Sequence, residues 1–163
     1  MDDNSIPQFA CDAMLGGLAR WLRAAGYDAS WNERIDDSDL IHLSRAEGRV
    51  LLSSDSGIFH RNVVRDGVVP SVFVPRGMSP QGQLAHVLAE LALPLRDARC
   101  MACGGSLIEV PKEQVQGRVP PRTFVWINRY WDCSRCGKVY WHGTHWERIV
   151  EQLRQAIGPA GKM

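Results

Sequence analysis

The chain contains two CxxC pairs, Cys100-Met101-Ala102-Cys103 and Cys133-Ser134-Arg135-Cys136, and these decide the fold of its second half. Thiolates at this spacing can converge from two knuckle turns on one tetrahedral zinc ion. Gly104-Gly105 follows the first pair and Gly137 follows the second, and glycine suits tight turns. We therefore expect a small β-rich zinc ribbon whose structural zinc is held by Cys100, Cys103, Cys133 and Cys136.

A disulfide framework is the alternative use for these cysteines. The N-terminus, Met1-Asp2-Asp3-Asn4, is acidic and lacks the apolar region of a secretory signal. No segment approaches the ~20 apolar residues of a membrane span, so no membrane partner is expected. We therefore expect a cytoplasmic, reducing location with a zinc site. The fifth cysteine, Cys11, lies in a short apolar run and is expected to be buried.

Charge is distributed unequally along the chain. Residues 1–94 hold 12 acidic and 8 basic side chains, whereas residues 95–163 hold 6 acidic and 11 basic ones. An acidic half beside a basic half is typical of a catalytic or metal-binding unit next to a polyanion-binding one. Chance scatter of charge in a small protein is the alternative. The length of 163 residues fits one or two small domains.

Short apolar runs alternate with amphipathic segments in the first ninety residues. The pattern predicts strands at 9–11, 28–31, 50–53 and 71–74, and helices at 15–25, 36–47 and 81–92. Ser79-Pro80 is typical of an N-cap followed by a first-turn proline. This alternation with short connections predicts an α/β sandwich with a parallel sheet, covering a first domain of residues 1–94.

The segment from Pro94 to Arg99 is the expected joint to a second domain, residues 95–163. Residues 112–122 are expected to be an extended excursion, and 123–127 and 139–141 to be β-runs. Thr144-His145-Trp146-Glu147 has the pattern of a capping box. The C-terminal helix that it would start carries an apolar stripe of Ile149, Val150, Leu153 and Ile157.

Acidic residues follow two of the predicted strands. Asp12 and Asp55 each lie just past the end of a strand, and in an open parallel sheet those ends face one crevice. Asp36-Asp37-Ser38-Asp39 opens the second helix. Carboxylates that converge repel each other unless a cation lies between them. Oxygen ligands without His or Cys suit Mg²⁺ or Mn²⁺.

Each of these acids also has a structural explanation. Asp36 or Asp37 is a possible helix cap, Asp39 a solvated first-turn acid and Asp55 a turn residue. A phosphoacceptor receiver domain would gather carboxylates in the same place, but it needs a lysine late in the sheet, and all three lysines lie after residue 94. The GxxxxGK[ST] and GxGxxG patterns are absent, so no nucleotide cofactor is expected.

Longer stretches of the sequence carry a family resemblance. They are Asp12-Ala13-Met14-Leu15-Gly16-Gly17-Leu18-Ala19-Arg20-Trp21-Leu22-Arg23-Ala24-Ala25-Gly26-Tyr27-Asp28, then Asp36-Asp37 with Leu40, Gly48-Arg49-Val50-Leu51-Leu52 leading to Asp55, and Gln83-Leu84. Arg99-Cys100-Met101-Ala102-Cys103 and Cys133-Ser134-Arg135-Cys136-Gly137-Lys138-Val139-Tyr140-Trp141, running on to Gly143-Thr144-His145-Trp146, complete the pattern. Residues 8–154 resemble the mut-seven C-terminal RNase domain family, a PIN-like nuclease domain fused to a C-terminal zinc ribbon.

The resemblance implies a PIN-like three-layer sandwich and a metal-dependent ribonuclease. The family's acids map to Asp12, Asp37 (or Asp36) and Asp55, which would bind Mg²⁺ or Mn²⁺. The chain departs from the family at Ser54, where a basic residue is frequent before the third acid, and at Gly17, where a basic residue is also common. These departures concern phosphate contacts more than the fold.

RNA, preferably single-stranded, is the expected partner. Arg20 and Arg23 lie three residues apart on one predicted helix and would hold phosphates, unless they form a solvated face. The ribbon supplies further cations, with Arg129, Arg135 and Lys138 as the chief candidates, and several tryptophans and tyrosines that would stack on bases or pack inside the ribbon. His142 and His145 are expected to be packing residues, since four thiolates complete a zinc site.

Three functions remain open from the sequence. The first is a metal-dependent ribonuclease. The second is a non-catalytic RNA- or ribosome-associated zinc-ribbon binding protein, which the changes at Gly17 and Ser54 favour. The third is a toxin-type nuclease, for which the sequence identifies no protein partner.

Overall fold

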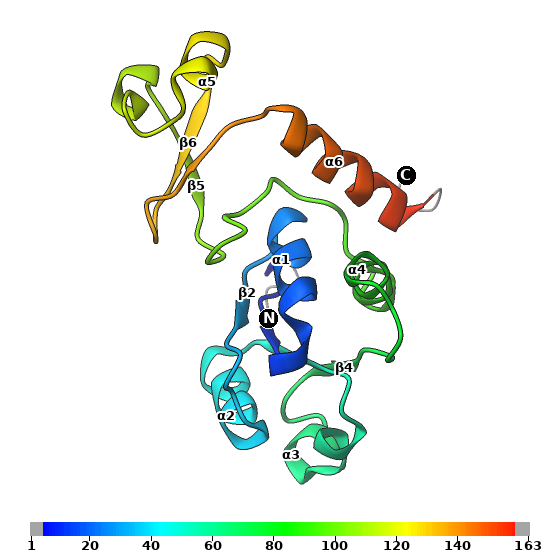
Figure 1. Ribbon diagram of the computed structural model, residues 1–163. Helices are drawn as coiled ribbons and strands as arrows, with labels where there is room; N and C mark the ends of the chain where they lie inside the picture. Colours follow the sequence, from blue (N-terminus) through cyan, green and yellow to red (C-terminus); the bar gives the residue numbers. More distant parts are fainter. Residues whose placement is uncertain (1–4, 159–163) are drawn as a thin grey trace.

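The computed structural model describes residues 5–158 of the chain (Figure 1). A four-stranded parallel sheet has the order β2-β1-β3-β4, and a three-stranded antiparallel sheet has the order β5-β6-β7. The strands are β1 Phe9–Cys11, β2 Ala29–Trp31, β3 Val50–Ser53, β4 Ser71–Phe73, β5 Leu107–Val110, β6 Tyr130–Cys133 and β7 Val139–Tyr140. The α-helices are α1 Gly16–Ala24, α2 Asp37–Glu47, α3 Asn62–Arg65, α4 Pro80–Glu90, α5 Pro121–Trp126 and α6 Thr144–Ile157.

Helices cover both faces of the parallel sheet. Successive strand residues point to opposite faces, so Phe9 and Leu52 pack with α1 and α4, whereas Ala10 and Leu51 pack with α2 and α3. Each face thus has its own buried apolar cluster, and the central strands β1 and β3 are almost fully enclosed between them, whereas the edge strands β2 and β4 each end in an exposed aromatic residue. The expected three-layer α/β arrangement is confirmed.

The strand order places a crevice between β1 and β3. The chain leaves β1 through α1 to reach β2 on one side, then crosses through α2 on the opposite face to reach β3 on the other side. The winding direction therefore reverses between β1 and β3, and ligands bind at the carboxyl ends of strands that flank such a reversal. The amide of Asp12, directly after β1, still donates to the carbonyl of Leu52 in β3 at 2.9 Å.

The zinc-ribbon half differs from two of the sequence expectations. The β-run predicted over 123–127 is wrong, because residues 123–126 belong to α5, which starts at Pro121 with Pro120 before it, and Ile127 is the C-cap of this helix. Proline at the first helical position has a preset φ and needs no amide partner, so it overrides the β-branched and aromatic residues that follow. The extended excursion predicted over 112–122 is also wrong in its first part, where Lys112–Val115 forms a 3₁₀ helix.

The start of the C-terminal helix also differs from the prediction. Thr144 is not the N-cap: α6 already includes Thr144, Gly143 precedes it as the cap, and no side chain caps the helix. The amide of Glu147 donates to the carbonyl of Gly143 at 3.0 Å, so the first helical turn already begins there and no capping box forms. The apolar stripe itself is confirmed by the burial of Ile149 and Leu153.

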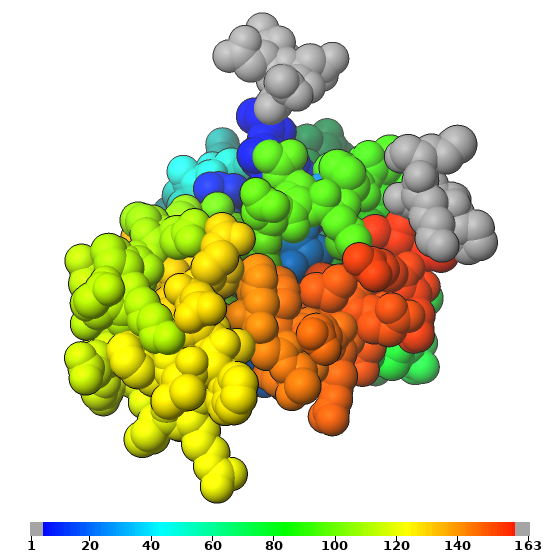
Figure 2. Space-filling view, turned by 90° about the horizontal axis from the view of Figure 1, so that it is seen from above, coloured from blue at the N-terminus to red at the C-terminus, as the bar shows by residue number. Residues whose placement is uncertain are grey.

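Helix α6 returns to the parallel-sheet half of the molecule. Ile149 and Leu153 join the apolar cluster between the sheet, α1 and α4. Figures 1 and 2 show α6 running from the ribbon across to α4, with the ribbon and α6 side by side on one face. The division at residues 94 and 95 remains a prediction, but the C-terminal helix packs on the first half of the chain.

Candidate active site and metal centre

Asp12 is held rigidly at the carboxyl end of β1. Its side chain is buried, with 4% exposure. One carboxylate oxygen, Oδ1, accepts from the amide of Ala13 at 2.8 Å, and the other, Oδ2, accepts from the hydroxyl of Ser53 at 2.6 Å. A buried carboxylate with both oxygens hydrogen-bonded has little freedom to rotate, so its position is preset for a ligand.

Ser53 links two of the predicted acids. Its Oγ donates to Asp12 and accepts from the amide of Asp55 at 3.0 Å. Asp55 is half-buried and its Oδ1 accepts from the amide of Gly57 at 2.9 Å. Ser53 was not among the site residues predicted from the sequence, although a fully buried serine at the end of an apolar strand needs a polar partner.

Helix α2 brings a third acid to this edge. Asp36 is the N-cap, and its Oδ1 accepts from the amide of Asp39 at 2.8 Å. Asp37 is the first helical residue: burial raises its pKa, and the nearby charges of Asp12 and Asp55 raise the pKa further, against an opposing effect of Arg61. The sequence left Asp36 and Asp37 as alternatives: Asp36 is engaged as the helix cap, whereas the pKa of Asp37 is raised by the charges of both other acids as well as by burial.

The chemistry of this donor set fits a hard divalent cation. Burial is the main cause of the raised pKa of Asp37, and the negative charges of Asp12 and Asp55 raise that pKa further. Within residues 5–158, the four cysteines described below form a group tight enough to hold a metal ion, whereas the three aspartates do not. Mg²⁺ commonly takes only one or two carboxylates and keeps several waters.

The four cysteines of the two CxxC pairs meet in one place. All four sulfur atoms lie within 4.8 Å of one another, with Cys100 3.6 Å from Cys136 and Cys103 3.4 Å from Cys133. Burial raises the pKa of the Cys133 thiol, but the amides of Cys136 and Arg135 and the neighbouring sulfurs outweigh this and lower it to about 6. Four thiolates fill all four positions of a tetrahedral site, which suits a structural zinc.

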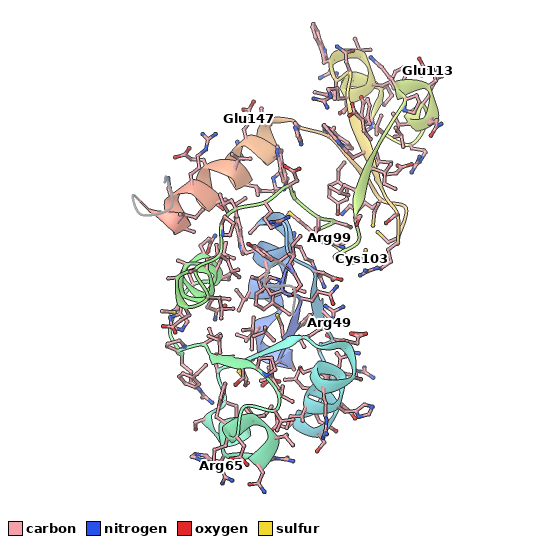
Figure 3. All side chains as sticks on the ribbon, turned by 180° about the vertical axis from the view of Figure 1, so that it is seen from behind. Arg49, Arg65, Arg99, Cys103, Glu113 and Glu147 are labelled. Atoms are coloured by element: carbon pink, nitrogen blue, oxygen red, sulfur yellow. The ribbon has the colours of Figure 1, made fainter. Side chains whose placement is uncertain are left out.

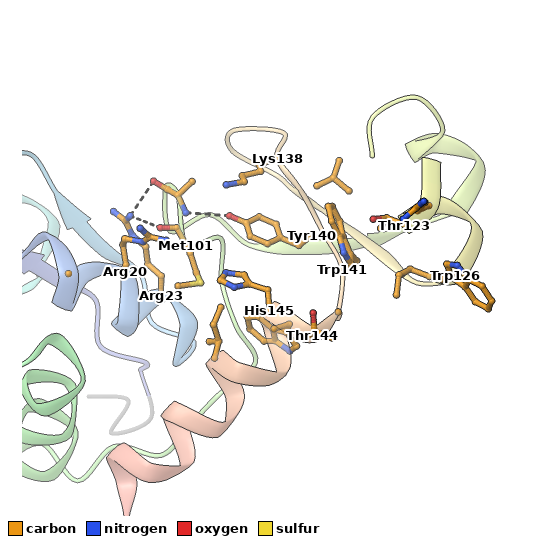
Figure 4. A pocket seen from close by; sticks show the side chains of 18 of the residues that line it. Arg20, Arg23, Met101, Thr123, Trp126, Lys138, Tyr140, Trp141, Thr144 and His145 are labelled. Atoms are coloured by element: carbon orange, nitrogen blue, oxygen red, sulfur yellow. Dashed lines mark hydrogen bonds between the residues drawn. The ribbon is translucent and has the colours of Figure 1, made fainter. Parts of the chain in front are cut away.

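The first zinc knuckle is docked on the parallel-sheet half (Figures 3 and 4). Arg23 of α1 is 6% exposed, and its guanidinium donates to the carbonyls of Ala29 (2.9 Å), Met101 (3.0 Å) and Ala102 (3.2 Å). Gly104 has a φ of +85°, and a Cβ there would lie 2.8 Å from Oδ1 of Asp28. Both contacts need the knuckle backbone to approach β2 closely.

This geometry separates Arg23 from Arg20. The guanidinium of Arg23 donates to backbone carbonyls at the junction, which fits a structural role better than the expected phosphate contact. Arg20, in contrast, is exposed. We expect Arg23→Ala to lower the free energy of unfolding by about 2–4 kcal/mol, because buried carbonyls lose a charged donor. Arg20→Ala on the same helix should change it by less than ~0.5 kcal/mol. Urea unfolding of the two variants checks this, and equal effects would contradict it.

The ribbon cations named in the sequence analysis lie in different surroundings. Arg129 forms two bonds with Glu109, at 2.9 and 3.0 Å, and its guanidinium lies over the ring of Trp131. Arg135 donates to the carbonyl of Cys103 and to Asp28. Lys138 is exposed, with its ammonium 5.6 Å from the ring centre of Tyr140. Of the five predicted phosphate contacts, Arg20 and Lys138 therefore combine exposure with a place on one common cavity.

Comparison with known protein families matches the description Mut7-C RNAse domain over residues 7–153. The chain belongs to this family. The Mut7-C match spans both the parallel-sheet half with its three aspartates and the ribbon with its Cys₄ cluster, and it indicates a ribonuclease. The comparisons with curated proteins and with solved structures gave no match. Among residues 5–158, no helix of this Mut7-C chain has the length and apolarity needed to span a membrane.

Gly17 and Ser54, the two departures expected from the resemblance, lie in different surroundings. A Cβ at Gly17 would lie 2.8 Å from Cγ of Pro80, so glycine lets α1 approach the start of α4. Ser54 is buried, and its carbonyl accepts from Nε of Arg76 at 3.3 Å. A guanidinium from the segment after β4 therefore lies beside the residue that precedes Asp55.

Proposed function

We propose that this chain is a divalent-metal-dependent ribonuclease that hydrolyses phosphodiester bonds of single-stranded RNA, with its zinc ribbon aiding RNA binding. The family match supports a ribonuclease. The observation that supports the location of the centre is that Ser53 contacts both Asp12 and Asp55 at the reversal between β1 and β3. Burial, and then the charges of these two acids, raise the pKa of Asp37.

In this proposal Asp12 and Asp55 hold Mg²⁺ or Mn²⁺. Such a cation, when bound, lowers the pKa of a coordinated water and neutralises charge on the scissile phosphate. Ser53 fixes Asp12 and Asp55 relative to each other, because its hydroxyl donates to the Asp12 carboxylate and accepts from the Asp55 amide. Asp37, with its raised pKa, is suited to accept a proton from the attacking water on a carboxylate oxygen, or to complete the cation site.

Positive charge beside the acids would receive the RNA backbone. Arg76 lies next to Ser54, and Arg61 is close enough to Asp37 to lower its pKa. Both side chains are exposed. A guanidinium can hold a phosphate through two parallel hydrogen bonds, so either side chain can take over the contact that a basic residue before the third acid supplies elsewhere in the family.

Binding of the cation should be measurable as stabilisation of the fold. With Mn²⁺ at 100 times its Kd, the free energy of unfolding should rise by about 2.7 kcal/mol, or roughly 5–10 °C in Tm. Asp12→Asn should lose most of this shift, because Asp12 is a proposed cation ligand, and Asp39→Asn, an exposed acid of α2, should keep it. Thermal unfolding with Mn²⁺ or chelator checks this, and equal shifts in both variants would contradict the assignment of Asp12.

The shift should also depend on pH in a defined direction. Because the pKa of Asp37 is raised in the folded protein, the cation-free fold loses stability as pH rises through that pKa. A bound cation offsets the cost of the charged Asp37 carboxylate, so the stabilisation by Mn²⁺ should increase as pH rises over the same range. As pH falls, this stabilisation should be lost at a higher pH than it would be with an ordinary aspartate. A shift that persists unchanged to low pH would contradict this account. Cleavage of labelled single-stranded RNA tests the activity itself.

A further inference from the structure

A large cavity lies between α1, the ribbon and α6, outside the aspartate site (Figure 4). Its volume is about 1140 Å³. This exceeds the ~300–1,000 Å³ of ordinary small-molecule sites, so the cavity has room for a segment of a polymer. Three parts of the chain that are distant in sequence form its walls, and the zinc knuckle and Arg23 hold two of them together.

The lining combines aromatic rings with cations. The rings belong to Trp31, Trp126, Tyr140, Trp141 and Trp146. The exposed cations are Arg20, Arg122 and Lys138. Of the residues that the structure describes, 5–158, no aspartate or glutamate lines the cavity. A cavity that has positive charge, no negative charge and many ring faces is complementary to a polyanion that itself carries flat rings.

Two of the tryptophans are presented to solvent in a way that folding alone does not explain. Trp126, at the end of α5, is 80% exposed, and Trp31, at the end of β2, is 40% exposed. The indole of Trp31 is fixed because its Nε1 donates to the carbonyl of Ala13 at 2.9 Å. Gly16 makes this position possible, since a Cβ there would lie 2.8 Å from the Trp31 ring.

Trp31 also connects the cavity to the aspartates. The indole of Trp31 donates to the carbonyl of Ala13, and the amide of Ala13 donates to Oδ1 of Asp12. The aromatic wall of the cavity therefore ends one residue from the acid at the end of β1. A strand of nucleic acid bound along this wall has a short route to the carboxyl edge of the sheet.

We propose that this cavity binds single-stranded RNA, with bases stacked on Trp126 and Trp31 and phosphates against Arg20 and Lys138. The delivery of the adjoining phosphodiester to Asp12 rests on the proposed ribonuclease function, whereas the binding itself does not. Bases in a duplex are stacked on each other and have no free faces, so the rings select unpaired RNA.

The test measures binding without cleavage, using Asp12→Asn protein and a fluorescent 12-nucleotide oligouridine. Adding Trp126→Ala should weaken binding between about 5-fold and 150-fold, the range for loss of one base–aromatic stack. The matched control is Val125→Ala, which removes the neighbouring exposed apolar side chain of α5 outside the cavity and should change the affinity less than about 2-fold. Zinc content and circular dichroism establish that the variants are folded.

Two further measurements distinguish specific binding of RNA from a general attraction of anions. They are the salt dependence of the affinity and competition by other polymers. Lys138→Ala should lower the slope of log K against log salt by about 0.7, the value for one phosphate contact on a single strand. A duplex of the same length and polyglutamate should compete poorly. Equal affinities of the Trp126→Ala and Val125→Ala proteins would overturn the proposal, and so would polyglutamate competing as well as RNA, which would make the cavity a site for acidic peptides.

Failure of this proposal is distinguishable from failure of the ribonuclease proposal. If the oligonucleotide binds in the expected way but wild-type protein does not cleave it with Mn²⁺, the cavity assignment stands and the ribonuclease assignment falls. If wild-type protein cleaves RNA but the Trp126→Ala change leaves the affinity for RNA unaltered, the ribonuclease assignment stands and the cavity assignment falls.

Discussion

Cys133→Ser is expected to release the metal and to unfold the ribbon while the parallel sheet stays folded. Apparent binding free energies for structural zinc are about 10–16 kcal/mol at neutral pH. The ribbon has only a small core of its own, with Val115, Val119 and Tyr130 buried, so it has little else to hold it together. Hydrogen exchange should show loss of protection over residues 99–143 and retained protection in β1 and β3, with less than one zinc per chain.

The matched control for this variant is Cys11→Ala. Cys11 is 1% exposed in the sheet core, and burial raises the pKa of its thiol to about 12, so it is an inert packing residue. That variant should keep one zinc per chain and a protected ribbon. Retention of full zinc content and unchanged exchange in Cys133→Ser would show that the quartet is not the metal site.

Asp12→Asn is expected to reduce RNA cleavage by about 10³-fold or more. Metal-assisted charge stabilisation contributes several kcal/mol to such reactions, and each 1.36 kcal/mol is a factor of ten in rate. The amide keeps an oxygen that can accept from Ala13, so the fold should survive. The rate of cleavage of labelled single-stranded RNA with Mn²⁺, compared with wild-type protein, measures this effect.

Asp39→Asn serves as the control for charge alone. Asp39 is an exposed acid in the first turn of α2, close in sequence to Asp37, and its amide rather than its carboxylate takes part in the cap. Its removal should leave the cleavage rate within about 2-fold of wild type, as for surface changes in general. Undiminished cleavage by pure Asp12→Asn protein would place the centre elsewhere.

The sheet and the three longer helices of the first half could be predicted closely, whereas the short helix α3 was not predicted. Buried parallel strands are short apolar runs that end at polar residues, which is why β1 and β3 match their predicted bounds. The ribbon could not be predicted as well, because its strands pair around a zinc framework rather than around an apolar pattern. The aromatic run 123–127 has strand propensity, yet the preceding prolines start a helix there.

Tertiary contacts explain what the sequence could not settle at the candidate site. Asp12 and Asp55 follow from strand ends, but only the docking of α2 distinguishes Asp36, which caps the helix, from Asp37, whose pKa is raised by burial and by the charges of Asp12 and Asp55. Arg20 and Arg23 have the spacing of one helix face, yet the first zinc knuckle covers Arg23 alone. That knuckle lies 78 residues further along the chain, beyond the reach of a helical pattern.

The most direct measurement is a time course of cleavage of a labelled single-stranded RNA by wild-type protein with Mn²⁺, with Mg²⁺ and with chelator, beside identically purified Asp12→Asn protein. We expect cutting with a divalent cation, none with chelator and none by the variant. Cleavage that survives chelation, or RNA that is bound by wild-type protein but left intact with either cation, would contradict a metal-dependent nuclease built on these three aspartates.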